Sequence, residues 1–167
     1  NGSGVRFEIC KDGTKQGLNA TKRLAANVWT HVTVTIGKDG ANIYLDGKLN
    51  ASTAEITFRP SDVAPSLAYL GRSMFDADPL LKGAIGDVRL YNYPLEGETI
   101  EKLYYSDQIG AANELAATPM NASTRNTLVD AIKEAESAIE SGDEETIKSA
   151  LSSLKTAMSK AQSSAES

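Results

Sequence analysis

Between Trp29 and Asn92, polar and apolar residues alternate in short runs that are separated by turn-forming residues. Within Trp29–Ile36, the apolar residues Val32, Val34 and Ile36 fall at every second position, which is the period of a β-strand with one buried side. The run Ile43-Tyr44-Leu45 leads into Asp46-Gly47. An Asp-Gly pair beside an apolar run is typical of a β-hairpin, because both central residues of a type I′ turn need a positive φ.

The first part of the chain is therefore expected to be built from short antiparallel strands. Gly, Pro, Asn and Asp cluster between the apolar runs, as they do in a β-sandwich. The expected strands are Val5–Ile9, Trp29–Ile36, Ala41–Leu45, Glu55–Phe58, Leu67–Leu70 and Ala84–Tyr91.

The hydrophobic period changes after residue 95. Ile100, Leu103 and Tyr104 follow the i, i+3, i+4 spacing of an amphipathic helix, which we place at Glu96–Tyr105. Residues 106–122, rich in Ala, Asn and Gly, are interpreted as a linker that could carry a helical turn.

Residues 123–167 carry two apolar stripes with helical spacing. Ser123 and Thr124 are candidates for the N-cap of the first helix, Gly142 is placed to end it, and Asp143 is placed to cap the second. The pattern predicts an antiparallel helical hairpin. Because two helices bury little apolar area, we expect the hairpin to dock on the strand region or on a segment outside this chain.

Composition limits the possible partners. The 167 residues carry a formal net charge of −5, and no basic stripe is present that could neutralise phosphates. The charge therefore argues against nucleic acids and anionic membrane surfaces as partners. One cysteine allows no internal disulfide, and no apolar run approaches the ~18 residues of a membrane helix.

Several pieces of the strand region match a known family in order and spacing. Together they resemble the second half of a laminin-G-like module of the concanavalin A-like lectin/glucanase superfamily. The pieces are WTHVTVT at 29–35, IYLDGK at 43–48, YLG at 69–71, GAIGDVRLYN at 83–92, and Pro94-Leu95.

The resemblance implies an antiparallel jelly-roll β-sandwich over residues 1–105, followed by the linker at 106–122 and the helical hairpin at 123–167. The expected class is thus mainly β with an α appendage. The resemblance also implies that the opening strands of the module are missing, because Val5–Ile9 corresponds to a strand from its middle. Such modules occur beside catalytic domains of extracellular bacterial glycoside hydrolases, where they bind carbohydrate or act as spacers.

Carbohydrate binding would require exposed aromatic rings, because the C–H faces of sugars stack on them. Four residues are eligible, and Tyr93, at a turn before Pro94, is expected to be the most exposed of them. The four are Tyr69, Phe75, Tyr91 and Tyr93. Trp29 and His31 match framework positions of the family, so we interpret both as architectural.

Two other kinds of chemistry are weighed against simpler interpretations. Asp76 and Asp78 are the best candidates for a calcium site, followed by Asp62, although the simpler and preferred interpretation is a solvated acidic loop. Glucanases of this superfamily carry a Glu-x-Asp-x-x-Glu signature on one strand, and residues 1–105 contain none.

The sequence therefore predicts that this chain is not itself an enzyme. We expect a non-catalytic carbohydrate-binding accessory module, part of a larger glycoside hydrolase secreted to the exterior or surface of a bacterial cell. Its partners would be a polysaccharide or glycan and the neighbouring catalytic domain of the same polypeptide. The alternative is a structural spacer that positions the catalytic domain and has no ligand of its own.

Overall fold

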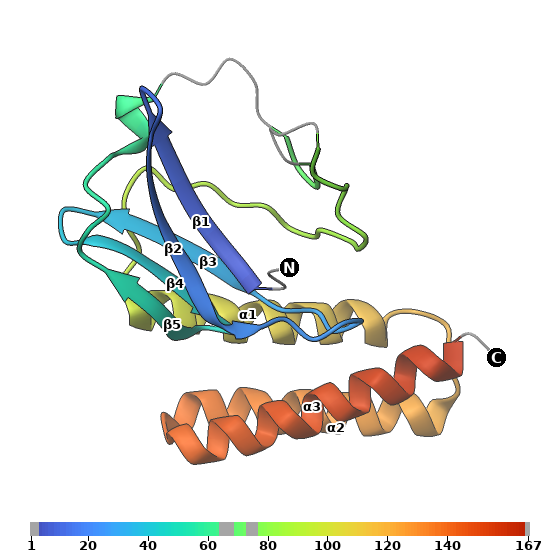
Figure 1. The fold of residues 1–167 in the computed structure, drawn as a ribbon. Helices are drawn as coiled ribbons and strands as arrows, with labels where there is room; N and C mark the ends of the chain where they lie inside the picture. Colours follow the sequence, from blue (N-terminus) through green and yellow to red (C-terminus); the bar gives the residue numbers. More distant parts are fainter. Residues whose placement is uncertain (1–3, 64–68, 73–76, 166–167) are drawn as a thin grey trace. The chain divides into compact units, whose positions relative to one another are not determined.

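The structure is a computed structural model that describes residues 4–63, 69–72 and 77–165. The chain divides into two compact units, residues 1–101 and residues 102–167. The first unit contains two antiparallel sheets, and the second is helical (Figure 1). Helix α1 (Gly97–Ala116) begins in the first unit and ends in the second.

The first sheet is a two-stranded hairpin. Strand β1 (Gly4–Lys11) contains the expected Val5–Ile9 strand and pairs with β2 (Thr14–Arg23), which the sequence analysis did not predict. Asp12 and Gly13 connect them with φ values of 48° and 80°, as a type I′ turn requires. Strand β2 is mostly polar, so period-two apolar alternation misses it. The Asp-Gly pair is the signal that could have revealed it.

The second sheet has the order β3-β4-β5 and is antiparallel throughout. Strand β3 (Val32–Gly37) begins three residues later than predicted, and β4 (Gly40–Leu45) agrees closely with the prediction. The predicted turn at Asp46-Gly47 is confirmed, with φ values of 50° and 79°. It leads into β5 (Lys48–Thr53), a largely polar strand that alternation also failed to predict.

The strand predicted at Glu55–Phe58 does not form, because side chains bind its backbone groups instead. The side-chain oxygen of Gln16 accepts hydrogen bonds from the N–H groups of Thr57 (2.8 Å) and Phe58 (2.9 Å). The Arg59 guanidinium donates to the carbonyls of Thr57 and Phe58 at 3.2 and 3.3 Å. The backbone is thus satisfied without a partner strand.

Two further predicted strands are not observed. Of Leu67–Leu70, residues 67 and 68 lie outside the described part, and Tyr69 and Leu70 belong to no strand. The described residues 77–96 contain neither helix nor strand, so Ala84–Tyr91 is wrong as a paired strand (Figure 1). Within it, Asp87 has a φ of 43°, which is incompatible with a regular strand at that position.

The core of the first unit joins the two sheets. Ile9 of β1, Ala41 of β4 and Ile56 form a buried cluster. Partly buried side chains from β1, β2, β3 and the segment around the 3₁₀ turn η1 (Pro60–Asp62) pack against it. They are Phe7, Leu18, Ile36, Phe58 and Val63.

The second unit contains the two predicted helices, α2 (Ala122–Ser141) and α3 (Glu144–Ala165). The N-cap of α2 is Asn121, two residues before the predicted Ser123, and its side chain accepts from the N–H of Thr124. Gly142 ends α2 with a φ of 72°, as predicted. Asp143 accepts from the N–H of Thr146 at 2.8 Å and so caps α3.

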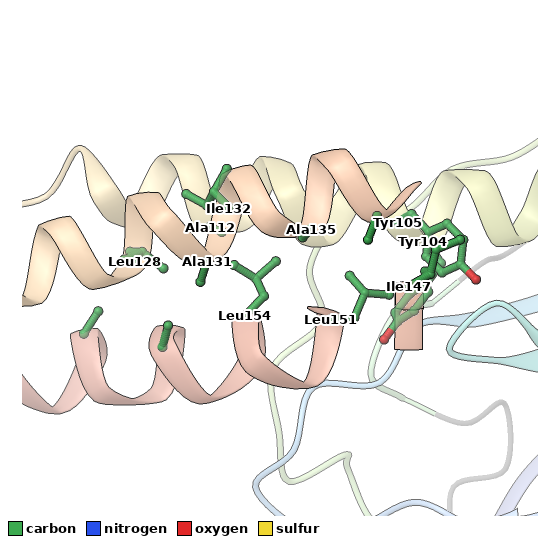
Figure 2. Close-up of a cluster of buried hydrophobic side chains, with 13 residues drawn as sticks. Tyr104, Tyr105, Ala112, Leu128, Ala131, Ile132, Ala135, Ile147, Leu151 and Leu154 are labelled. Carbon is green, nitrogen blue, oxygen red and sulfur yellow. The ribbon is translucent and has the colours of Figure 1, made fainter. Parts of the chain in front are cut away.

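Helix α1 supplies the surface that the predicted hairpin lacked. It extends eleven residues beyond the predicted Tyr105, through much of the segment interpreted as a linker. Its Tyr104, Tyr105 and Ala112 share one core with α2 and α3 (Figure 2). The second unit is therefore three-helical. The described residues also hold more helix than strand, so the expectation of a mainly β chain is corrected.

Candidate aromatic binding site

The segment that precedes α1 carries exposed side chains at four alternate positions, which we call the aromatic row. They are Asp87, Arg89, Tyr91 and Tyr93. Arg89 forms an ion pair with Asp87, and two positions later the rings of Tyr91 and Tyr93 meet edge to face. Their centroids are 6.2 Å apart and the planes are inclined by 69°. Both contacts join residues two positions apart in the chain.

The tyrosine pair is open to solvent. Tyr91 is 45% and Tyr93 is 61% exposed, and Tyr93 is the more accessible of the two, as the sequence analysis expected. Between them and the ion pair, Leu90 is 95% exposed. The row thus presents two ring surfaces at an angle to each other, with a carboxylate and a guanidinium close by along the chain.

Contacts with the three-stranded sheet fix the end of this segment. The Pro94 ring packs on Gly37 at the β3–β4 turn, where a β-carbon on the glycine would lie 3.3 Å from the proline ring. Gly97, the first residue of α1, lies against the ring of Tyr44. One turn further, Glu101 forms an ion pair with Lys48 of β5. The tyrosines therefore directly precede an anchored stretch of backbone.

The other two predicted aromatic residues are not brought into this pair. Tyr69 is exposed, and the Arg72 guanidinium lies 5.0 Å from its ring centroid, a cation–π arrangement. Phe75 lies outside the described residues. The structure thus joins Tyr91 with Tyr93 and gives Tyr69 a separate cationic neighbour.

The predicted calcium ligands do not form a site in the described part of the chain. Asp78 is exposed, and Asp76 lies outside the described residues. The Asp62 carboxylate accepts from the N–H of Arg59 at 2.8 Å and so caps η1. Across residues 4–63, 69–72 and 77–165, no three His, Cys, Asp or Glu side chains are grouped to hold a metal ion.

Trp29, Asp87 and Arg89 were not proposed as site residues from the sequence. Trp29, interpreted as a framework residue, is 65% exposed, and Gly86 lies beside its indole ring. Asp87 and Arg89 pair with each other. Their i, i+2 spacing with Tyr91 and Tyr93 was visible in the sequence and could have identified the row.

The backbone of His31 is hydrogen-bonded to the turn between β4 and β5. Its backbone N–H donates to the Asp46 carboxylate at 3.1 Å, and the Asp46 N–H donates to the His31 carbonyl at 2.8 Å. This reciprocal pair holds the chain entering β3 to the β4–β5 turn.

A second polar cluster lies on the outer face of β1 and β2. Glu8 binds both Arg6 (2.6 Å) and Lys15 (3.1 Å), and Arg6 also donates to the side chain of Asn19. Hydrogen bonds from Arg6 and then Lys15 lower the pKa of Glu8. The cluster includes no aromatic ring. The groove between α2 and α3, about 860 Å³, is likewise lined by small and charged side chains without a ring.

None of the helices in the described residues is both long enough and apolar enough to span a membrane.

Comparison with known proteins identifies the family of the strand region. No curated protein matches this chain significantly. One similar solved structure is that of residues 221–444 of an S-layer domain-containing protein from Clostridium thermocellum, with 22% sequence identity and a TM-score of 0.39. The match covers 60% of this chain and about half (51%) of that one. The family model of the concanavalin A-like lectin/glucanases superfamily, of laminin-G type, matches residues 1–101. The chain therefore belongs to the concanavalin A-like lectin/glucanases superfamily.

Proposed function

We propose that this chain is a non-catalytic carbohydrate-binding accessory module of a larger secreted bacterial glycoside hydrolase. In this proposal the strand region is part of a jelly-roll sandwich, and Tyr91 and Tyr93 form the glycan-binding surface. The observation that carries it is the exposed edge-to-face pair of these two rings. Membership of a superfamily that includes lectins is a supporting analogy of fold.

The geometry of the pair suits a pyranose ring. A sugar presents C–H groups on its faces and hydroxyl groups at its rim, so it stacks on one aromatic ring and leaves its rim to polar partners. With planes inclined by 69°, one tyrosine offers a floor and the other a side wall. Asp87 and Arg89, on the same row, supply an acceptor and donors for hydroxyl groups.

Affinity electrophoresis in gels that contain soluble polysaccharides, together with a glycan array, tests this proposal. Tyr93→Ala should remove most of the retardation, because the more exposed ring is lost. Tyr93→Phe keeps the stacking surface and should retain most of it. Leu80→Ala removes an exposed aliphatic side chain outside the row and serves as the matched control. Lack of retention of the wild-type chain on every glycan, or equal retention of Tyr93→Ala, would contradict the proposal.

A second candidate function is a structural spacer that positions a catalytic domain. Helix α1 favours it, since this single 20-residue helix belongs to both compact units. In the parent polypeptide, deletion of this region should then lower the melting temperature of the catalytic domain while affinity for isolated glycans stays constant. If the region binds carbohydrate instead, its deletion should lower the affinity for isolated glycans and leave the melting temperature of the catalytic domain constant.

A further inference from the structure

The indole of Trp29 is an exposed aromatic surface outside the tyrosine pair. It belongs to the first unit, three residues before β3, and 65% of the residue is open to solvent. Tryptophan side chains are highly buried on average, because they carry a large apolar surface. An indole this open leaves most of that surface in water, so a ligand that covers it is bound favourably.

Glycine at position 86 leaves the indole free of a neighbouring side chain on that side. A β-carbon at Gly86 would lie 3.7 Å from two atoms of the six-membered ring of Trp29, Cζ3 and Cη2. This is ordinary van der Waals distance, so a larger side chain at this position would lie against the ring. Gly86 is itself exposed, and the next residue is Asp87, the first of the aromatic row. The indole therefore lies beside the end of the aromatic row that is farther from the tyrosines.

The indole and the tyrosine pair are too far apart for one sugar to reach both. The Pro94 ring, next to Tyr93, contacts Gly37 at the end of β3, whereas Gly86 contacts Trp29 before the start of β3. Strand β3 is six residues long and alone spans roughly 17 Å. A pyranose is only about as wide as one aromatic ring. A ligand that contacts both aromatic surfaces must therefore be several sugar units long.

The ion pair of Asp87 and Arg89 lies between the two aromatic surfaces in the order of the chain. Both residues are exposed. The carboxylate accepts hydrogen bonds and the guanidinium donates them, which suits the hydroxyl groups at the rim of a sugar. From Gly86 to Tyr93, the chain thus offers a stacking surface, a polar pair and a second stacking surface.

We propose that Trp29 forms a second stacking subsite, and that the ligand is an extended β-1,4-linked glycan chain bound along the aromatic row. This inference rests on the proposed function, because Tyr91 and Tyr93 supply the first subsite. One sugar stacks on the tyrosine pair and a more distant sugar of the same chain stacks on the indole. The sugars between them form hydrogen bonds with Asp87 and Arg89. The ligand is thus an internal stretch of polysaccharide.

The separation of the two subsites argues for a straight glycan. In β-1,4-linked chains of glucose, xylose or N-acetylglucosamine, both linkages of each pyranose are equatorial, so the chain is extended and its C–H faces stay open for stacking. An α-1,4-linked glucose chain has one axial linkage in each unit and coils. Two subsites on one chain also make affinity depend on ligand length, because the second contact forms within the same complex.

Isothermal titration calorimetry on the whole chain tests this length dependence. The probes are the disaccharide and the hexasaccharide of β-1,4-linked glucose, xylose and N-acetylglucosamine, with maltohexaose as the α-1,4-linked control. In at least one β-1,4 series, the hexasaccharide should bind about tenfold or more tightly than the disaccharide. Maltohexaose should bind about tenfold or more weakly than that hexasaccharide.

Substitutions of single aromatic residues separate the two subsites. Trp29→Ala should lower the affinity for the hexasaccharide to that for the disaccharide, whereas Trp29→Phe keeps a stacking ring and should retain most of it. Tyr93→Ala should weaken the binding of both ligands. Leu80→Ala removes an exposed side chain outside the site and should change neither affinity. Circular dichroism and thermal unfolding establish that each variant is folded.

Fluorescence supplies a second readout on the unmodified chain, because Trp29 is the sole tryptophan. In the free chain, acrylamide should quench its emission readily, as for an exposed indole. The hexasaccharide that binds best should shift the emission to shorter wavelength and reduce the quenching. The matching disaccharide should have a much smaller effect. This measurement does not depend on the folding of any variant.

Several results would overturn the second subsite alone. They are equal affinity for disaccharide and hexasaccharide, wild-type binding of the hexasaccharide by Trp29→Ala, equal binding of maltohexaose, or an indole that is already shielded from acrylamide in the free chain. Binding that is lost in Tyr93→Ala would still support the proposed function in each case. The inference also fails if no β-1,4-linked probe binds. Retention on a different glycan would then support the proposed function only, and lack of retention on every glycan would contradict both.

Discussion

Gly40, the first residue of β4, lies directly against the backbone carbonyl of Thr53, the last residue of β5. A β-carbon at position 40 would overlap that carbonyl oxygen and would lie 2.7 Å from the α-carbon of Ala54. Gly40 also has a φ of 108°, which L-residues rarely adopt. Both the conformation and the close approach of two strands therefore require glycine here.

Gly40→Ala is expected to lower the free energy of unfolding of the first unit by about 3 kcal/mol or more, because backbone strain and overlap with a fixed carbonyl add. Gly13→Ala is the matched control. Gly13 also has a positive φ, 80°, but a β-carbon there would meet no atom within 4 Å. It should cost only about 1 kcal/mol. Urea unfolding followed by Trp29 fluorescence measures both, and equal costs would contradict the steric argument.

Gln16 replaces a neighbouring strand for residues 57 and 58. Gln16→Ala would leave the two N–H groups without their acceptor and should lower stability by about 1–2 kcal/mol. Gln16→Glu keeps an oxygen acceptor in the same place and should cost less. Hydrogen exchange at Thr57 and Phe58 is the direct measurement. If Gln16→Ala leaves both amides as protected as in the wild type, the side chain is not their principal partner.

The sequence allowed the turns and the helices to be predicted better than the strands. Asp46-Gly47 and Gly142 were predicted correctly, because a positive φ selects few residue types. The stripes of α2 and α3 repeat over five turns, so single exceptions do not obscure them. Polar strands such as β2 and β5 give no alternation, and their positions follow from the turns that precede them.

The remaining differences arise from contacts distant in the sequence. Nothing near residues 55–58 indicates that Gln16, 41 residues earlier, binds their backbone. The end of α1 depends on Ala112, which is fully buried in the three-helix core but is an unremarkable alanine in the sequence. For the candidate site, alternation between Asp87 and Tyr93 was visible beforehand. The edge-to-face angle of the rings was not.

Leu154 tests whether the second unit depends on one shared core. It is fully buried among side chains of the helical unit (Figure 2). Leu154→Ala should lower stability by about 2–5 kcal/mol, because it removes buried methyl groups and leaves a cavity. Leu49→Ala, at an exposed site in the first unit, should change stability by less than about 0.5 kcal/mol. Calorimetry measures both, and a small effect at Leu154 would indicate a loosely packed helical core.

Calcium is expected to leave the stability of this chain unchanged, in agreement with the interpretation of Asp76 and Asp78 as a solvated acidic loop. Asp78 is exposed, and Asp62 is engaged in capping η1, so the described candidates do not converge on one point. Thermal unfolding with millimolar calcium and with a chelator is the measurement. A calcium-dependent rise in melting temperature that disappears in both Asp76→Asn and Asp78→Asn would instead establish a site.

The capping interaction at Asp143 should make the stability of the helical unit depend on pH. Hydrogen bonds from the Thr146 hydroxyl and then its backbone N–H lower the pKa of Asp143. The folded chain therefore binds a proton at this site less readily than the unfolded chain. The contribution of the Asp143 carboxylate to the free energy of unfolding is therefore fully present above the ordinary aspartate pKa of about 3.9. It is lost as the pH falls through the lower pKa of the folded chain.

Asp143→Asn isolates this contribution, because asparagine also caps helices well but does not titrate in this range. The difference in unfolding free energy between wild type and Asp143→Asn should be constant from pH 7 to about pH 5 and should shift in favour of the variant at lower pH. Comparing the two proteins at each pH cancels the titration of groups common to both, such as Glu8. Glu144 and Glu145 also lie in the first turn of α3, so the neutral variant additionally reduces the negative charge there. A pH-independent difference down to pH 2 would mean that the carboxylate does not cap α3 in solution.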